Sequence, residues 1–278
     1  MTASGTGKTI GVFDSGFGGL TVLRALIDRL PGARFAFLGD TARLPYGSKS
    51  RRTIARYAAQ SAQFLVREQG AEFLVIACNT ASALALDAIQ DAVPVPVLGV
   101  IEPGASAARK ASVTGDVLVI ATEATVHSHA YAASCRARGL RAIEKACPLL
   151  VPLVEEGWID HPVTEQVIDI YLDELRAEAA ARGMQQDALV LGCTHYPLLR
   201  PLIERAVRPG VKVIDSAEAA AQAAVELLSE RVKPVAEGGT TETEVRCFAT
   251  DSVEKFERLG SRFLGRPVGH VELIDLGG

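Results

Sequence analysis

The amino-acid sequence predicts an α/β protein with two similar doubly wound parallel-sheet domains that face each other, with the active site at their interface. Apolar runs of strand length alternate with helical patterns, which is typical of parallel sheets. The series of strands begins again after residue 104, which predicts a second unit of the same kind. An apolar run that ends at Cys78 also has a counterpart that ends at Cys193.

The first half of the chain contains the first series of elements. The expected strands are 8–13, 34–40, 74–78 and 95–100. The expected helices are 20–30, 51–69 and a segment from 84 that ends at 91–94. Proline and glycine at 103–104 indicate a crossover to the next unit.

The second half repeats this series and then adds a tail. Its expected strands are 116–121, 141–147, 188–193 and 211–215. The tail is expected to contain a helix at 218–230, a polar loop at 234–244, strands at 246–250 and 270–274, and a helix at 251–264. We expect it to return to the first unit, giving one domain of residues 1–100 plus 212–278 with Cys78, and another of residues 101–211 with Cys193.

Length, charge and cysteine content limit the class of protein. The 278 residues are enough for one large or two small domains. The net charge is −4 and no basic run exceeds Arg51–Arg52, which argues against nucleic-acid or anionic-membrane partners. Asn79 and Thr80 interrupt the most apolar stretch, and residues 1–8 lack a targeting pattern. Five cysteines without paired spacing indicate a reduced, cytoplasmic protein.

Two glycine-containing segments resemble nucleotide-binding motifs but depart from them. Residues 5–9 match the end of a Walker A loop, yet they precede a strand instead of following one. Gly16 and Gly18 follow a strand, but Thr21 replaces the third glycine of a dinucleotide fingerprint. These glycines would let backbone N–H groups approach a small anion. Asp14 would then belong to the site, or alternatively it caps the following helix.

Cys78 and Cys193 are the candidate reactive groups. Parallel strands place ligands at their carboxyl ends, where both cysteines lie. A helix N-terminus after each cysteine is expected to lower the thiol pKa. A thiolate on one side of a carbon and a thiol on the other can invert it by proton transfer, with Asp14 and His195 as tuning neighbours. The alternative is that both cysteines are small buried hydrophobic residues.

Other possible ligands have structural interpretations. His127 and His129 would share one side of a strand, but no third ligand with metal spacing is nearby, so we expect no metal. Cys147 and Pro148 are expected to belong to a buried strand.

Eight motifs together resemble one known family, the cofactor-independent glutamate racemases of the aspartate/glutamate racemase superfamily. They are residues 13–20, 39–43, 45–47, 77–82, 100–104, 121–125, 146–155 and 191–197. The match covers most of the chain. It implies interconversion of L- and D-glutamate without pyridoxal phosphate or metal, and a supply of D-glutamate for peptidoglycan. It also implies two domains that clamp the amino acid, in a homodimer.

The resemblance also implies roles for single residues. Cys193 would take the proton from L-glutamate and Cys78 from D-glutamate, assisted by His195 and Asp14, while Glu155 would orient His195. The implied substrate-binding residues are Asp14, Ser15, Pro45, Tyr46, Gly47, Asn79, Thr80, Thr122, Thr194 and His195.

Three other interpretations remain open from the sequence. A sister enzyme would racemise aspartate or a hydantoin. A binding module for small anions would use the same loops without chemistry. Some members of the family that the chain resembles also act on a DNA topoisomerase, and the sequence neither supports nor excludes this second role.

Overall fold

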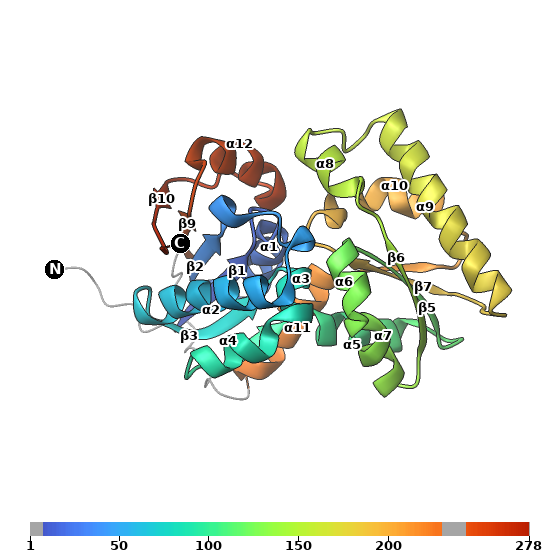
Figure 1. Ribbon diagram of the computed structural model, residues 1–278, viewed down its shortest axis with the longest axis horizontal. Coiled ribbons are helices and arrows are strands. Elements are labelled where there is room, and N and C mark those ends of the chain that lie inside the picture. The colour runs from blue at the N-terminus through green and yellow to red at the C-terminus, as the bar shows by residue number, and fades with distance from the viewer. Residues whose placement is uncertain (1–7, 230–242, 278) are drawn as a thin grey trace.

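Two parallel sheets form the centre of the protein, as the alternation of strands and helices predicts. The computed structural model describes residues 8–229 and 243–277. The sheets lie side by side, each with its own helices, and the chain passes from one to the other and back (Figure 1). The expected α/β class with two such units is confirmed.

The first sheet contains six of the described strands, all paired in parallel. Their spatial order is β10 (Val271–Leu273), β9 (Glu244–Ala249), β2 (Arg34–Gly39), β1 (Thr9–Asp14), β3 (Ala71–Ile76) and β4 (Val97–Gly99). The tail therefore completes this sheet, because β9 pairs with β2. The helices of this unit are α1 (Leu20–Arg29), α2 (Arg51–Arg67), α3 (Asn79–Leu84), α4 (Leu86–Ala92) and α12 (Val253–Leu264).

The second sheet repeats the inner order of the first. Its order is β6 (Arg141–Ala146), β5 (Asp116–Ala121), β7 (Ala188–Gly192) and β8 (Lys212–Asp215), which matches β2, β1, β3 and β4. β8 pairs with β7, so these four residues lie in the second sheet, whereas the expected division at residue 212 gave them to the first domain. We propose that the second domain extends to Asp215.

The helices that follow β4 and β8 each cross to the other unit. α5 (Ile101–Ala111) follows β4 and packs against α7 (Ala130–Ala137) and β7 of the second unit. α11 (Ser216–Ser229) follows β8 and packs against α1 of the first unit through a buried, alanine-rich face. The remaining helices are α6 (Glu123–Ser128), α8 (Leu150–Glu155), α9 (Pro162–Ala181) and α10 (Arg200–Ala206), with 3₁₀ turns at η1 (Thr41–Arg43), η2 (Tyr46–Ser48) and η3 (Tyr196–Leu199).

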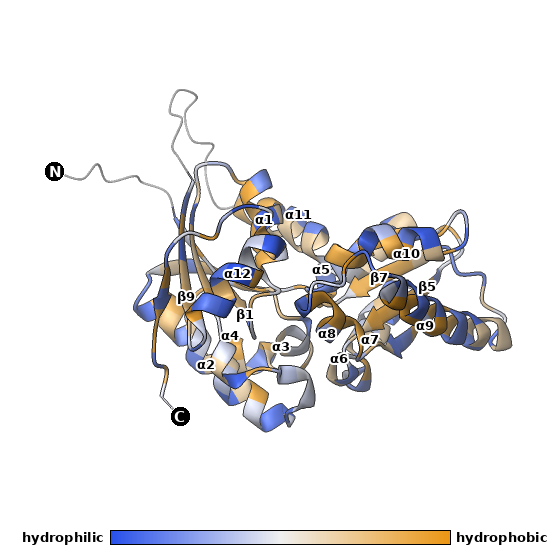
Figure 2. Ribbon diagram, turned by 90° about the horizontal axis from the view of Figure 1, so that it is seen from above, coloured by the Kyte–Doolittle hydropathy of each residue, from blue (hydrophilic) through white to orange (hydrophobic). Residues whose placement is uncertain are grey.

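The buried strands explain why the expected elements form. The central strands β5 and β7 of the second sheet are mostly hydrophobic, whereas α9, which packs against β6, mixes hydrophobic and hydrophilic residues (Figure 2). Strands covered on both faces read as continuous apolar runs, and covering helices read as amphipathic patterns. These are the two signals that the sequence contains.

Two local expectations are wrong. His127 lies in α6 and His129 follows it in a left-handed conformation, so no strand aligns these imidazoles. β6 ends at Ala146, so Cys147 and Pro148 follow the strand instead of continuing it.

Residues 234–242 of the expected polar loop lie outside the described residues. Within residues 8–229 and 243–277, no helix is both long and apolar enough to cross a membrane.

Candidate active site

A cavity of about 400 Å³ lies where the carboxyl ends of the two sheets meet. Its walls come from both units and include both candidate cysteines. The lining residues are Ser15, Gly16, Phe17, Leu44, Pro45, Tyr46, Gly47, Ser48, Cys78, Asn79, Thr80, Thr122, Glu123, Cys147, Pro148, Val151, Pro152, Glu155, Cys193, Thr194 and His195. The cavity therefore lies at the carboxyl ends of the strands, where the sequence predicts the active site.

Cys78 lies two residues beyond β3 and caps the N-terminus of α3. Its Sγ accepts a hydrogen bond from the Ala81 backbone N–H at 3.4 Å and donates one to Ser15 Oγ at 3.4 Å. Burial, with a smaller contribution from the negative charge of Asp14, raises the pKa of the thiol to about 11 despite the lowering effect of these hydrogen bonds. The expected lowering by the helix N-terminus is therefore wrong, because desolvation outweighs it.

Asp14 ends β1 directly behind the Cys78 wall. Its Oδ2 accepts the Gly16 backbone N–H at 2.9 Å, and its Oδ1 is buried without a hydrogen-bond partner among the described residues. Burial raises the pKa of this carboxyl group above its usual value. The residue at the start of α1 is Gly19, with no side-chain capping bond, so the alternative that Asp14 caps this helix is wrong.

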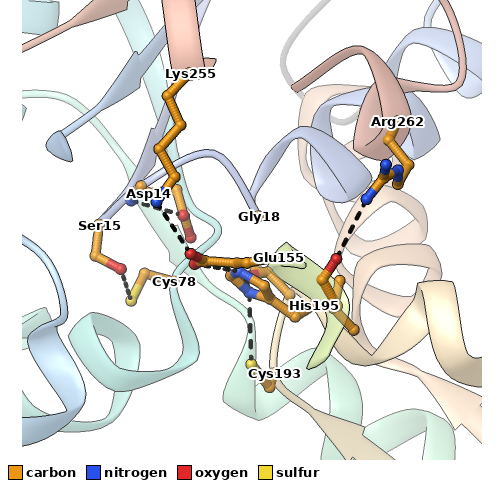
Figure 3. A network of polar contacts seen from close by, with 12 residues as sticks. Asp14, Ser15, Gly18, Cys78, Glu155, Cys193, His195, Lys255 and Arg262 are labelled. Carbon is orange, nitrogen blue, oxygen red and sulfur yellow. Dashed lines mark hydrogen bonds and ion pairs between the residues drawn. The ribbon is translucent and has the colours of Figure 1, made fainter. Parts of the chain in front are cut away.

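On the opposite wall, Cys193 follows β7 and lies beside His195. Cys193 Sγ is 3.9 Å from His195 Nδ1 (Figure 3). Thr194 Oγ1 is 3.4 Å from the same nitrogen. Burial raises the pKa of the Cys193 thiol, while a backbone hydrogen bond from His195 opposes the shift. The 3₁₀ turn η3, rather than an α-helix, follows this cysteine.

Glu155 connects His195 with the tail of the chain. Glu155 Oε1 is 3.3 Å from His195 Nε2, and Oε2 forms an ion pair with Lys255 Nζ at 3.3 Å (Figure 3). Burial alone would raise the pKa of Glu155, but its hydrogen bond with His195 and the charges of His195 and Lys255 lower it below its usual value. The Glu155 carboxylate therefore lies between the His195 ring and the Lys255 ammonium group.

The loop between β1 and α1 approaches the Cys193 wall closely. A Cβ built on Gly18 would lie 2.4 Å from Thr194 Oγ1 and 2.6 Å from His195 Nδ1. Thr21 Oγ1 also donates a hydrogen bond to the Thr194 carbonyl at 3.0 Å. Glycine at position 18 is therefore required for the two units to meet at the cavity.

Polar side chains from both units line the space between the thiols. Tyr131 OH donates to Asn79 Oδ1 at 2.8 Å, so the amide Nδ2 of Asn79 remains as a buried donor without a partner among the described residues. Thr80 and Thr122 form a hydroxyl pair at 3.0 Å across the interface. Such groups are suited to binding the polar ends of a small molecule.

The structure brings the expected site residues together. All of them line the cavity except Asp14, which supports the wall from behind. Three residues near the site have no site role predicted from the sequence: Cys147 lines the cavity, Tyr131 orients Asn79, and Lys255 contacts Glu155. Among the described residues, no group of three or more His, Cys, Asp or Glu is arranged to hold a metal ion.

Comparisons with known proteins assign the chain to a family. Residues 12–224 match the model of the Asp/Glu/hydantoin racemase family. A glutamate racemase from Koribacter versatilis is 53% identical, with 97% of this chain and 98% of that protein aligned.

Solved structures agree with this match. Glutamate racemase from Francisella tularensis, in complex with D-glutamate, is 37% identical with a TM-score of 0.85, covering 97% of this chain and 98% of that chain. Glutamate racemase from Thermus thermophilus, in complex with β-chloro-D-alanine, is 42% identical with a TM-score of 0.84, covering 97% of both chains. The resemblance to glutamate racemases is confirmed, and the chain belongs to the Asp/Glu/hydantoin racemase family as an amino-acid racemase.

Proposed function

We propose that this protein interconverts L- and D-glutamate by moving the α-proton between Cys78 and Cys193. The observation that carries the proposal is that two thiols, from the equivalent ends of β3 and β7, line one cavity. Inversion at a carbon needs a base on one face and an acid on the other. The relatives that bind D-glutamate or are named glutamate racemases support the choice of substrate.

In the direction from L-glutamate, the Cys193 thiolate takes the proton from Cα and becomes a thiol. The electron pair of the broken C–H bond is left on the substrate, and the Cys78 thiol donates its proton to the opposite face. Cys78 then carries the negative charge, so the reverse reaction from D-glutamate begins with the Cys78 thiolate. The proton count is unchanged over a turnover, so the reaction needs no oxidant or reductant.

The raised thiol pKa values mean that each thiolate has to be stabilised during turnover. The positive charge of the substrate's ammonium group, bound between the two walls, favours a nearby thiolate. His195, 3.9 Å from Cys193, is placed to accept a proton from that thiol. The resemblance gives Asp14 the assisting part on the Cys78 side, where burial raises the pKa of Asp14 and so favours the neutral carboxyl group, which does not oppose the Cys78 thiolate.

The cavity binds the two carboxylates of the substrate with neutral donors. None of its described lining residues is a lysine or an arginine. Hydroxyl groups of Ser15, Thr80, Thr122 and Thr194 and the free amide Nδ2 of Asn79 supply donors instead. Following the family resemblance, the side-chain carboxylate lies at the backbone of residues 45–47. The Tyr46 hydroxyl group donates to Asp40, which anchors this segment.

Circular dichroism of the purified protein with either enantiomer of glutamate tests the activity directly. The signal is expected to decay to zero from both sides without pyridoxal phosphate or added metal. Aspartate and alanine serve as controls for substrate choice. Faster decay with aspartate would contradict the glutamate assignment while leaving the family intact.

Single cysteine variants in heavy water test the two-thiol mechanism. Cys78→Ala and Cys193→Ala should each abolish racemisation, because one remaining thiol serves one face. Product formed by the wild type should carry solvent deuterium at Cα, while substrate recovered early should carry little. Substantial racemisation by either variant, or product that retains the original hydrogen, would rule out this mechanism. Cys135→Ala is a matched control, because this buried cysteine lies outside the cavity lining.

The biological setting is proposed from the same resemblance. We propose a cytoplasmic homodimer that supplies D-glutamate for peptidoglycan. Growth of a D-glutamate-requiring bacterium on expression of this chain would support the supply role, and failure of the active enzyme to restore growth would contradict it. Sedimentation velocity at several concentrations measures the oligomeric state.

A further inference from the structure

Helix α12 of the tail contacts the second unit beside the active site. Lys255 Nζ is 3.3 Å from Glu155 Oε2, and Arg262 Nη1 donates to the Val154 carbonyl at 3.4 Å. α12 packs against α1 and β10 of the first unit, whereas Glu155 and Val154 belong to α8 of the second. α12 and α8 face each other across the junction of the units (Figure 1). Both contacts therefore cross from one unit to the other.

A continuous chain of polar contacts leads from Lys255 to Cys193. Lys255 binds one oxygen of Glu155, and the other oxygen is 3.3 Å from His195 Nε2. The second ring nitrogen of His195 is 3.9 Å from Cys193 Sγ (Figure 3). Glu155 can satisfy both partners at once because each takes a different carboxylate oxygen.

We propose that Lys255 is a positioning residue for the reaction, which acts by holding the Glu155 carboxylate against His195 on the Cys193 side of the cavity. Lys255 does not line the cavity, so it acts through these two residues. This proposal rests on the proposed racemisation for its kinetic consequences, but its contacts can be tested without substrate.

The charges around Glu155 explain why a cation is needed there. His195 after β7 and Lys255 on α12 both lower the pKa of Glu155, and the Arg262 guanidinium of the same helix contacts the adjacent Val154 carbonyl. Asp14 at the end of β1 acts on His195, and Cys193 lies beside it. Without Lys255, the half-buried Glu155 carboxylate would have His195 as its remaining ion-pair partner among the described residues. Its pKa would then rise, and its carboxylate would be held less firmly against His195.

The same helix also fixes the His195 ring. The Phe263 ring of α12 meets the His195 ring edge-on with centroids 5.0 Å apart, and Phe17 lies 6.2 Å from His195. Lys255 Nζ lies 5.5 Å from the centroid of the Phe17 ring, which favours one location of the ammonium group. The location of the cation and the orientation of the imidazole are thus set by one element.

Four variants separate the charge of Lys255 from the docking of α12. Lys255→Met removes the charge and keeps the length of the side chain, and Lys255→Arg restores the charge. Arg262→Gln weakens the other contact between α12 and α8 while leaving Lys255 in place. Lys8→Met is the matched control, because its 4.0 Å ion pair with Glu72 lies beside the amino end of β1, away from the cavity.

The first measurement is the titration of the Glu155 carboxyl group, followed by ¹³C NMR without substrate and assigned with Glu155→Gln. Loss of the cation in Lys255→Met should raise the midpoint by roughly half a pH unit, a value discounted for the partial exposure of the pair. Lys255→Arg, Arg262→Gln and Lys8→Met should keep the wild-type midpoint. An unchanged midpoint in Lys255→Met would overturn the proposal, whether or not the wild type racemises glutamate.

The second measurement is the pH dependence of racemisation in both directions. Lys255→Met should lower kcat roughly tenfold with KM nearly unchanged, which is less than the roughly 10²-fold minimum for loss of a direct general acid or base, because Lys255 acts through Glu155 and His195. The acidic limb of kcat/KM should move to higher pH in step with the Glu155 titration, and Lys255→Arg should restore both. Loss of kcat in Arg262→Gln equal to that in Lys255→Met, or failure of Lys255→Arg to restore kcat, would overturn the proposal.

Discussion

At the scale of single residues, burial rather than helix capping controls the two thiols. Cys78 caps α3 by accepting the Ala81 backbone N–H, which favours a thiolate, yet its pKa is raised to about 11. The loss of water around a buried sulfur outweighs one weak hydrogen bond from a short helix. Sequence can identify which cysteine is capped, but the desolvation depends on how the second unit closes over it.

Alkylation rates measure this effect. Because the thiolate is the reacting form, alkylation of Cys78 by a small reagent should rise tenfold per pH unit toward about pH 11. A shift from an ordinary value of 9.0 to about 11 makes Cys78 roughly 100-fold slower than a free thiol near pH 7.5. Peptide mapping separates Cys78 from the other cysteines, and saturating glutamate should protect it. A plateau already at pH 8 would contradict control by burial.

At the scale of elements, the sequence predicts those site residues that lie at the end of an apolar strand. Asp14 ends and Cys78 follows an apolar strand of the first sheet, so parallel pairing brings both to the same edge of that sheet, and Cys193 lies at the equivalent edge of the second sheet. The tail helix expected at 251–264 is found at Val253–Leu264. Its contact between Lys255 and Glu155 could not be predicted, because an amphipathic pattern shows which face is buried but not which element covers it.

The β1–α1 loop offers a test of how closely the elements must meet. Gly18→Ala places a methyl group in the space occupied by Thr194 Oγ1 and His195 Nδ1, so the ring must move. We expect a folded protein with roughly 100-fold lower kcat/KM, the cost of a shift of about 1 Å in a catalytic group. Gly99→Ala is the matched control, since this residue of β4 lies outside the cavity lining and its Cβ would meet the Leu86 and Ser82 side chains at 3.2 Å. Equal activities of the two variants would refute the steric argument.

At the scale of the whole molecule, each unit contributes one helix that packs on the other unit, and these helices join the two units. α5 follows a strand of the first sheet but packs on the second, and α11 follows a strand of the second but packs on α1. The cavity then takes one thiol from each unit. A ligand that binds between the thiols therefore contacts both units and should stabilise them together.

Thermal unfolding with glutamate measures this coupling. A ligand present at 100 times its Kd stabilises the folded state by about 2.7 kcal/mol, which raises Tm by roughly 5 °C for a chain of this size. We expect one cooperative transition that moves upward as a whole, by the same amount from L- or D-glutamate, because the enzyme equilibrates them. An equal concentration of sodium chloride is the control for ionic strength. Two separate transitions, of which glutamate moves one, would mean that the substrate is held by a single unit, and a site shared between the facing thiols would then be excluded.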